Sequence, residues 1–137
     1  MDSKDELVKN WIVKAQHDLL AAQKLSSDSD IYSDIAIYHC QQCAEKVLKG
    51  FLVLQNQTFP RTHDLRLLLQ LAIALNPDFQ HYQETSELLT PYATEFRYPS
   101  DVMQPTVAEL QEAIEKAEEI FYFIASLLSD EIRSFLI

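Results

Sequence analysis

The stretch Ile37-Tyr-His-Cys-Gln-Gln-Cys-Ala-Glu-Lys-Val-Leu-Lys-Gly50 decides the fold prediction for this chain. On a helical wheel of about 100° per residue, its apolar side chains and those of its neighbours fall on one arc. That arc holds Ala36, Cys40, Cys43, Ala44, Val47, Phe51 and Leu54. The pattern predicts a helix over residues 33–55 with one face in a hydrophobic core.

The two cysteines form a Cys-x-x-Cys pair next to His39, a pattern that redox and metal sites also show. A redox pair of the thioredoxin kind lies at a helix N-terminus after a strand, where the thiol pKa is lowered, whereas this pair lies in the middle of a predicted helix. A zinc site needs two further ligands, and the nearby candidates are His39, which points off the cysteine face, and His63. We therefore expect both cysteines to be core packing residues; a metal site and a redox pair are the alternatives.

The composition predicts one globular domain, residues 1–137, with ordinary fractions of hydrophobic (47%) and charged (23%) residues. A single glycine favours long helices with short connections, and it excludes glycine-rich phosphate-binding loops. The formal net charge of -10 opposes nonspecific binding to nucleic acid or to anionic lipid.

The first residues of the chain, its most apolar run and its cysteines indicate its compartment. The first residues lack the basic and apolar regions of a signal peptide, and the run at residues 120–128 is too short to span a bilayer. Two cysteines three residues apart in one helix cannot cross-link the fold. We expect a cytoplasmic protein without a membrane segment.

The remaining helices are predicted from periodicity and from turn-forming residues. The five predicted helices cover about residues 4–25, 33–55, 64–75, 82–96 and 106–128. The run Ser26-Ser-Asp-Ser-Asp30 ends the first, Asn76-Pro77 the third and Tyr98-Pro99-Ser-Asp101 the fourth, in which Pro91 is the place for a kink. Thr106-x-x-Glu109 is a capping-box pattern at the start of the fifth. The prediction is an all-α, up-and-down bundle of about five helices.

A polar row borders the apolar arc of the second helix. It consists of His39, Gln42, Lys46 and Lys49, and Gln41 and Glu45 form a second row. A solvated helix face would explain such a row. However, basic residues are scarce in this chain, and a row beside the core lies at a groove between helices, where several donors can converge on an anionic ligand or a phosphate. We also expect Asp18, on the apolar stripe of the first helix, to meet Lys46 or Arg97, because a buried carboxylate needs a partner.

Four motifs together resemble the HEPN domain (higher eukaryotes and prokaryotes nucleotide-binding). They are Trp11-x3-Ala15-x2-Asp18-Leu19, His39-x-Gln41-Gln42-x2-Glu45-Lys46-x-Leu48-Lys49, Thr62-His63-Asp64-Leu65 and Arg97-Tyr98-Pro99. They cover nearly the whole chain, in order. The resemblance implies a helical bundle that forms homodimers, and a frequent partner, a small nucleotidyltransferase, in modules that often act as toxin and antitoxin.

Many HEPN proteins are metal-independent ribonucleases in which an Arg is followed four to six residues later by a His. No His follows Arg97 at that spacing, so the general acid or base that RNA cleavage needs is missing there. The Tyr that accepts adenylyl groups in some members is missing as well. The sequence is similar to a non-nucleolytic branch with Arg-Tyr-Pro, and no catalytic residue is predicted.

For Arg97 two interpretations stay open. It is a helix C-terminal cation or the ion-pair partner of Glu45 or Asp18, or it binds phosphate with Lys46 while Tyr98 stacks on a base or closes the groove. His63 is expected to be a cap or a buried hydrogen-bonding residue. The predicted ligand-binding residues are His39, Gln42, Lys46, Lys49, Arg97 and Tyr98, supported by Asp18, Glu45 and His63.

Three functions follow from these residues. The first is an accessory protein that binds a nucleotide such as ATP or GTP and partners a nucleotidyltransferase. The second is an interaction module without a ligand, which engages its partner elsewhere, for example on the acidic fifth helix. The third is a ribonuclease that combines Arg97 with His63 or with His39 of the other subunit.

Overall fold

The computed structural model describes residues 1–28, 30–99 and 103–137. In these residues the chain forms helices and no strand, which confirms the all-α prediction. The elements are α1 (Ser3–Asp28), η1 (Asp30–Tyr32), α2 (Ser33–Leu54), α3 (Leu65–Leu75), η2 (Pro77–Tyr82), α4 (Gln83–Leu89), η3 (Thr90–Ala93), α5 (Val107–Ser126) and α6 (Asp130–Arg133), where η is a 3-10 helix.

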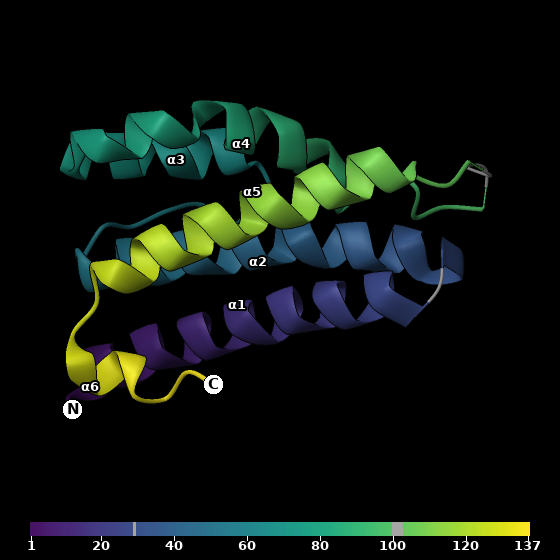
Figure 1. Ribbon diagram of the computed structural model, residues 1–137. Helices are drawn as coiled ribbons and strands as arrows, with labels where there is room; N and C mark the ends of the chain where they lie inside the picture. The colour runs from purple at the N-terminus through teal and green to yellow at the C-terminus, as the bar shows by residue number, and fades with distance from the viewer. Residues whose placement is uncertain (29, 100–102) are drawn as a thin grey trace.

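Helix α2 is the centre of the bundle. It packs against α1 on one side and against α5 and α3 on the others, and η3 also contacts it (Figure 1). Helices α3 and α4 cover the part of α2 and α5 that lies away from α1 (Figure 1). Polar residues at the border of the apolar face of α2 therefore lie where helices meet.

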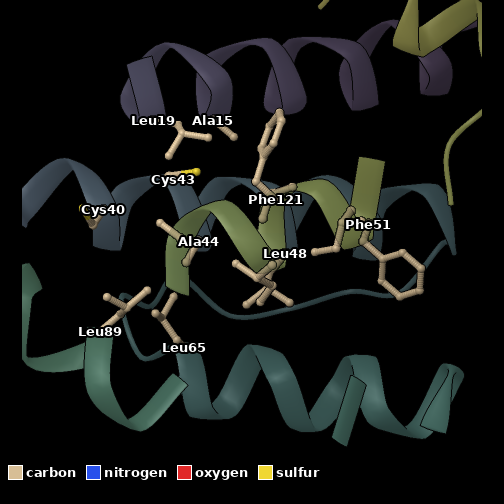
Figure 2. Packing of buried hydrophobic residues seen from close by; sticks show 14 of the residues in the cluster. Ala15, Leu19, Cys40, Cys43, Ala44, Leu48, Phe51, Leu65, Leu89 and Phe121 are labelled. Carbon is tan, nitrogen blue, oxygen red and sulfur yellow. The ribbon is translucent and has the colours of Figure 1, made fainter. Parts of the chain in front are cut away.

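Both cysteines lie in this core, as predicted. Cys40 and Cys43 are free thiols with no exposed surface, and Cys43 lies beneath Ala15 and Leu19 of α1 (Figure 2). Burial raises the pKa of Cys40 to about 12 and raises that of Cys43 well above its ordinary value. Because the thiolate is the reactive form, these thiols are chemically inert in the folded protein.

The single glycine lies at a close contact of α1 and α2. A Cβ atom at Gly50 would come within 2.8 Å of Ile12 Cδ1 and 3.1 Å of Trp11 Cβ. A larger residue would overfill this contact and move the two helices apart.

The first helix is longer than predicted. It continues to Asp28 instead of ending near Leu25. The Oγ atoms of Ser26 and Ser27 donate to the carbonyl oxygens of Gln23 and Lys24, so these serines bond back to the helix instead of ending it. The rest of the predicted break includes Ser29, which lies outside the described residues.

The predicted fourth helix over residues 82–96 is shorter than expected, and the segment is divided near Pro91, where a kink was predicted. Helix α4 ends at Leu89, and Pro91 lies in the first turn of η3. Proline lacks an N–H group and its ring clashes with the carbonyl four residues earlier, so α4 cannot continue through it. The predicted break at residues 98–101 falls partly outside the described residues.

The helix caps agree with the sequence. The Asp64 carboxylate accepts from the backbone N–H of Arg66 and caps α3, and Thr106 with Glu109 forms the predicted capping box of α5. The short helix α6 was not predicted; Ser129 caps it.

Candidate functional site

The carboxylate of Asp18, on α1, joins two side chains of α2. Its Oδ2 accepts a hydrogen bond from Lys46 Nζ at 2.7 Å, and its Oδ1 accepts one from His39 Nδ1 at 2.7 Å. Asp18 is 7% exposed, so its charge depends on these partners. The expectation that Asp18 meets a basic residue is confirmed for Lys46 and not for Arg97. We call Asp18, His39 and Lys46 the Asp18 cluster.

The Asp18 cluster fixes the orientation of the His39 ring. An ionised carboxylate only accepts hydrogen bonds, so Nδ1 of His39 carries the hydrogen. Nε2 is then the atom through which a half-buried His39 can accept a proton or contact a ligand. Lys46 is less available to a ligand, because its ammonium group is bonded to the Asp18 carboxylate.

A second cluster lies further along α2, around Glu45. Its Oε2 accepts from Lys49 Nζ at 3.1 Å, and its Oε1 accepts from Gln41 Nε2 at 3.2 Å and from His63 Nδ1 at 2.8 Å. Gln41 also donates to the backbone oxygen of His63 at 3.0 Å and accepts from Gln42 Nε2 at 2.7 Å. We call these five residues the Glu45 cluster; it fastens the loop before α3 to α2.

The Glu45 cluster is buried at Gln41, Glu45 and Lys49, whereas Gln42 is half-buried and His63 is exposed. Glu45 and Lys49 are 5% and 8% exposed, and the Lys49 ammonium lies 5.7 Å from the centre of the Trp11 ring and 5.9 Å from that of Phe59. His63 makes a hydrogen bond, as expected, but it is neither buried nor a cap: its side chain is 71% exposed, and Asp64 caps α3. Its hydrogen bond to Glu45 needs only one edge of the ring, so the rest stays in water.

Arg97 lies over an aromatic ring at the edge of a pocket. Its Cζ atom is 3.6 Å from the centre of the Tyr38 ring, a cation–π contact. The pocket has a volume of about 300 Å³ and is lined by Asp34, Ile35, Tyr38, His39, Phe96 and Arg97. Among the residues that the structure describes, the exposed guanidinium of Arg97 has no carboxylate partner.

The backbone turn before Arg97 is unusual. Phe96 has φ = 67°, in the left-handed region that bulky residues seldom adopt, while its ring stacks on Tyr92 at 6.1 Å. This conformation costs free energy of the order of 1 kcal/mol or more and persists only where the surroundings enforce it. It directs the next residue, Arg97, back over α2.

The structure thus gathers only some of the predicted site residues. His39 and Arg97 line one pocket, and Lys46 adjoins it through Asp18. Gln42 and Lys49 are bonded within the Glu45 cluster, and Tyr98, 61% exposed, does not line the pocket.

Three pocket residues of α2 were not predicted from sequence. Asp34 and Tyr38 are spaced i, i+4, as are Ile35 and His39, and this spacing is the signal that the two pairs form adjacent rows on α2. Neither their residue type nor the motifs marked them.

Two kinds of feature are absent from the described residues. No group of three or more His, Cys, Asp or Glu side chains within residues 1–28, 30–99 and 103–137 is arranged to hold a metal ion. None of the helices in this part of the chain combines the length and the apolar character that crossing a membrane requires.

Comparison with known proteins gives a family and a fold. Residues 8–127 match the family model of the HEPN domain. The chain is similar to ST0689, described as an archaeal HEPN homologue, at 29% identity and a TM-score of 0.70 over 89% of this chain and 98% of that one. It is also similar to TT1696 from Thermus thermophilus, at 27% identity and a TM-score of 0.72 over 88% and 98% of the two chains. No curated protein matches the chain.

Proposed function

The chain belongs to the HEPN domain family, and from this premise we propose that it is a binding protein that holds a nucleotide or another phosphate-containing ligand. One observation carries this proposal. The guanidinium of Arg97, without an ion-pair partner among the described residues, lies over Tyr38 in a pocket that also contains His39.

The chemistry of this pocket suits a nucleotide. A guanidinium offers paired N–H donors that match phosphate oxygens, and its stacking on Tyr38 holds it in place before a ligand arrives. Ile35 and Phe96 supply apolar walls for a base. Lys46 contributes at a distance, because it neutralises Asp18 and so lowers the negative potential beside the pocket.

Calorimetric titration with ATP, GTP and AMP, with and without magnesium, tests the proposal. Arg97→Ala is the informative variant, because Arg97 is exposed and its loss leaves no buried charge. Arg61→Ala is the matched control, since Arg61 is also an exposed arginine and does not line this pocket. We expect binding that Arg97→Ala weakens at least tenfold and Arg61→Ala leaves unchanged. Equal affinities in all three proteins, or no binding to any of them, would refute the proposal.

The proposed partner is a small nucleotidyltransferase, to which a homodimer of this chain presents its ligand in a module of the toxin–antitoxin kind. The support is the family membership, together with a charge of -10 that favours a partner with a basic surface. Co-expression with candidate nucleotidyltransferases tests the partnership, and light scattering of the purified protein tests the dimer. A monomer that co-purifies with none of them would exclude this part of the proposal.

A second candidate function is an interaction module without a ligand. It is favoured by the two clusters, in which most of the predicted binding residues are engaged by other side chains of the protein, namely Asp18, Gln41 and Glu45. Partner binding that is unaffected by Arg97→Ala, in a protein that binds no nucleotide, would support it.

The ribonuclease interpretation has one supporting observation, which is that His39 and Arg97 line the same pocket within one chain. A histidine and an arginine in one pocket can serve acid–base catalysis and charge stabilisation. RNA left uncut over a long incubation with purified protein would remove this candidate.

A further inference from the structure

Asp34 brings a second charge into the pocket of Arg97. It lies in the first turn of α2, is half-buried and lines the pocket. The carboxylates of Asp18, Glu45 and Asp64 each accept from at least two donor groups. Across residues 1–28, 30–99 and 103–137, no hydrogen bond or ion pair engages the Asp34 side chain.

The pocket thus holds an unpaired carboxylate and an unpaired guanidinium that do not bond each other within the described residues. An anionic ligand alone would satisfy Arg97 and be repelled by Asp34. A ligand that satisfies both residues must carry an anionic group and, elsewhere on the molecule, hydrogen-bond donors. The two apolar side chains of the pocket, Ile35 and Phe96, suit a flat ring in the middle of such a ligand.

We propose that Asp34 is a specificity-determining residue that selects guanine nucleotides over adenine nucleotides, an inference that rests on the proposed function. The Watson–Crick edge of guanine presents two adjacent donors, N1–H and the N2 amino group, which two carboxylate oxygens accept side by side. Adenine presents a donor beside an acceptor, N1, and that acceptor faces a carboxylate oxygen without a hydrogen between them. Arg97 then takes the phosphate.

The position of Asp34 has a simpler role, since an acidic residue in a first turn interacts favourably with the helix dipole. That role affects stability and does not distinguish one base from another. Ligand selectivity is therefore the readout that separates the two. Asp5 offers the matched control, as an acidic residue in the first turn of α1 that does not line the pocket.

The experiment is calorimetric titration of GMP, IMP and AMP into the full chain and its Asp34→Asn and Asp5→Asn variants. These nucleotides share ribose and phosphate; IMP keeps N1–H and lacks the N2 amino group. A correctly placed pair of hydrogen bonds to a base edge discriminates by roughly tenfold or more. We expect the unmodified protein and Asp5→Asn to bind GMP about tenfold more tightly than AMP, with IMP between them. Asp34→Asn loses this preference, because its amide donates where guanine also donates.

The outcomes separate this inference from the proposed function. Equal affinity of the unmodified protein for GMP and AMP, or a preference that persists in Asp34→Asn, overturns the role of Asp34 while Arg97-dependent binding stands. Absence of binding to all three nucleotides overturns both. The ranking of GMP, IMP and AMP by the unmodified protein tests the inference even if Asp34→Asn is unstable.

Discussion

The Asp18 cluster and the Glu45 cluster share a carboxylate, a lysine and a histidine but differ in their surroundings. In each, a buried carboxylate accepts from one lysine and from Nδ1 of one histidine. The lysine of the Glu45 cluster is buried under two aromatic rings, and its exposed histidine lies on a loop. The histidine of the Asp18 cluster lies on α2 and lines the pocket beside Arg97.

The difference shows that a polar constellation is not in itself a binding site. Both clusters fasten separate segments to α2, which is sufficient reason for their existence. Of the two, the Asp18 cluster adjoins a pocket that contains charged groups without partners among the described residues. The following predictions compare what each cluster contributes to the stability of the bundle and to the contact of α1 with α2.

The largest effect is expected from Glu45→Ala. It leaves the ammonium of Lys49, whose side chain is 10% exposed, without a counter-ion in the interior. Removing one partner of a buried ion pair costs about 3–5 kcal/mol. Urea unfolding followed by circular dichroism measures the change. The double variant Glu45→Leu/Lys49→Met should regain most of the loss, because it removes both charges; a double variant as unstable as the single one would contradict this account.

A smaller loss of stability is expected from Asp18→Asn. The side chains of Lys46 and His39 are 26% and 29% exposed, so water can hydrate them when the carboxylate is neutralised. Losing hydrogen bonds between charged groups costs about 1.5–3 kcal/mol. The same unfolding experiment gives the value. A cost larger than that of Glu45→Ala would reverse the order of the two clusters.

The thiols of α2 report local opening between α1 and α2. Cys43 faces Ala15 and Leu19 of α1 (Figure 2) and is close enough to feel the charges of Asp18 and Lys46, and Cys40 lies one turn earlier. Because burial holds the pKa of Cys40 at about 12 and that of Cys43 well above its ordinary value, neither thiol reacts with iodoacetamide at about pH 8 until the protein opens. We expect Asp18→Asn to raise the labelling of Cys43 relative to Cys40 severalfold.

In Glu45→Gln the two thiols should gain reactivity together, because this variant destabilises the whole bundle without separating α1 from α2 locally. Mass spectrometry of labelled peptides gives the ratio within one sample. A Cys43 to Cys40 ratio that changes equally in both variants would mean that Asp18 does not hold α1 to α2.

The smallest effect is expected at the exposed pair of Asp64 and Arg66, which calibrates the comparison. Hydrogen bonds from Arg66 hold the pKa of Asp64 below its ordinary value of 3.8. A lowered pKa in the folded state contributes stability above about pH 4, and this contribution is lost as the pH falls through the lowered value. Arg66→Ala should therefore shift the urea midpoint only slightly near pH 7, and the shift should shrink as the pH falls through the lowered pKa of Asp64. A large shift near pH 7 would show that exposure does not explain the difference between the clusters.

Much of the fold was predictable because helical periodicity is local. The arc of α2 places Cys40 and Cys43 in the core, and a carboxylate on the buried stripe of α1 had to meet a base, which is Lys46. Capping followed the same local logic at Thr106. These features depend on neighbours within a few turns or on the elementary cost of burying a charge.

The pocket was less predictable because it depends on contacts between distant segments. Arg97 reaches Tyr38 only because the chain turns at Phe96 in a conformation that its residue type disfavours. Asp34 resembles any acidic residue in a first turn until Arg97 is seen in the same pocket. Lys49, by contrast, shares the row of Lys46 on the wheel, and its burial follows from the Trp11 and Phe59 rings around it.

The close contact of α1 and α2 at Gly50 has a consequence for the order of folding. Helices α1 and α2 follow each other in the chain and form a hairpin, so the contacts near their connection close a short loop and can form early. The pocket residues Phe96 and Arg97, in contrast, must dock on α2 from a segment far along the sequence. On the ribosome, the N-terminal hairpin with the Asp18 cluster emerges first. The pocket is completed only when the segment with Phe96 and Arg97 has been synthesised, after the hairpin and before α5.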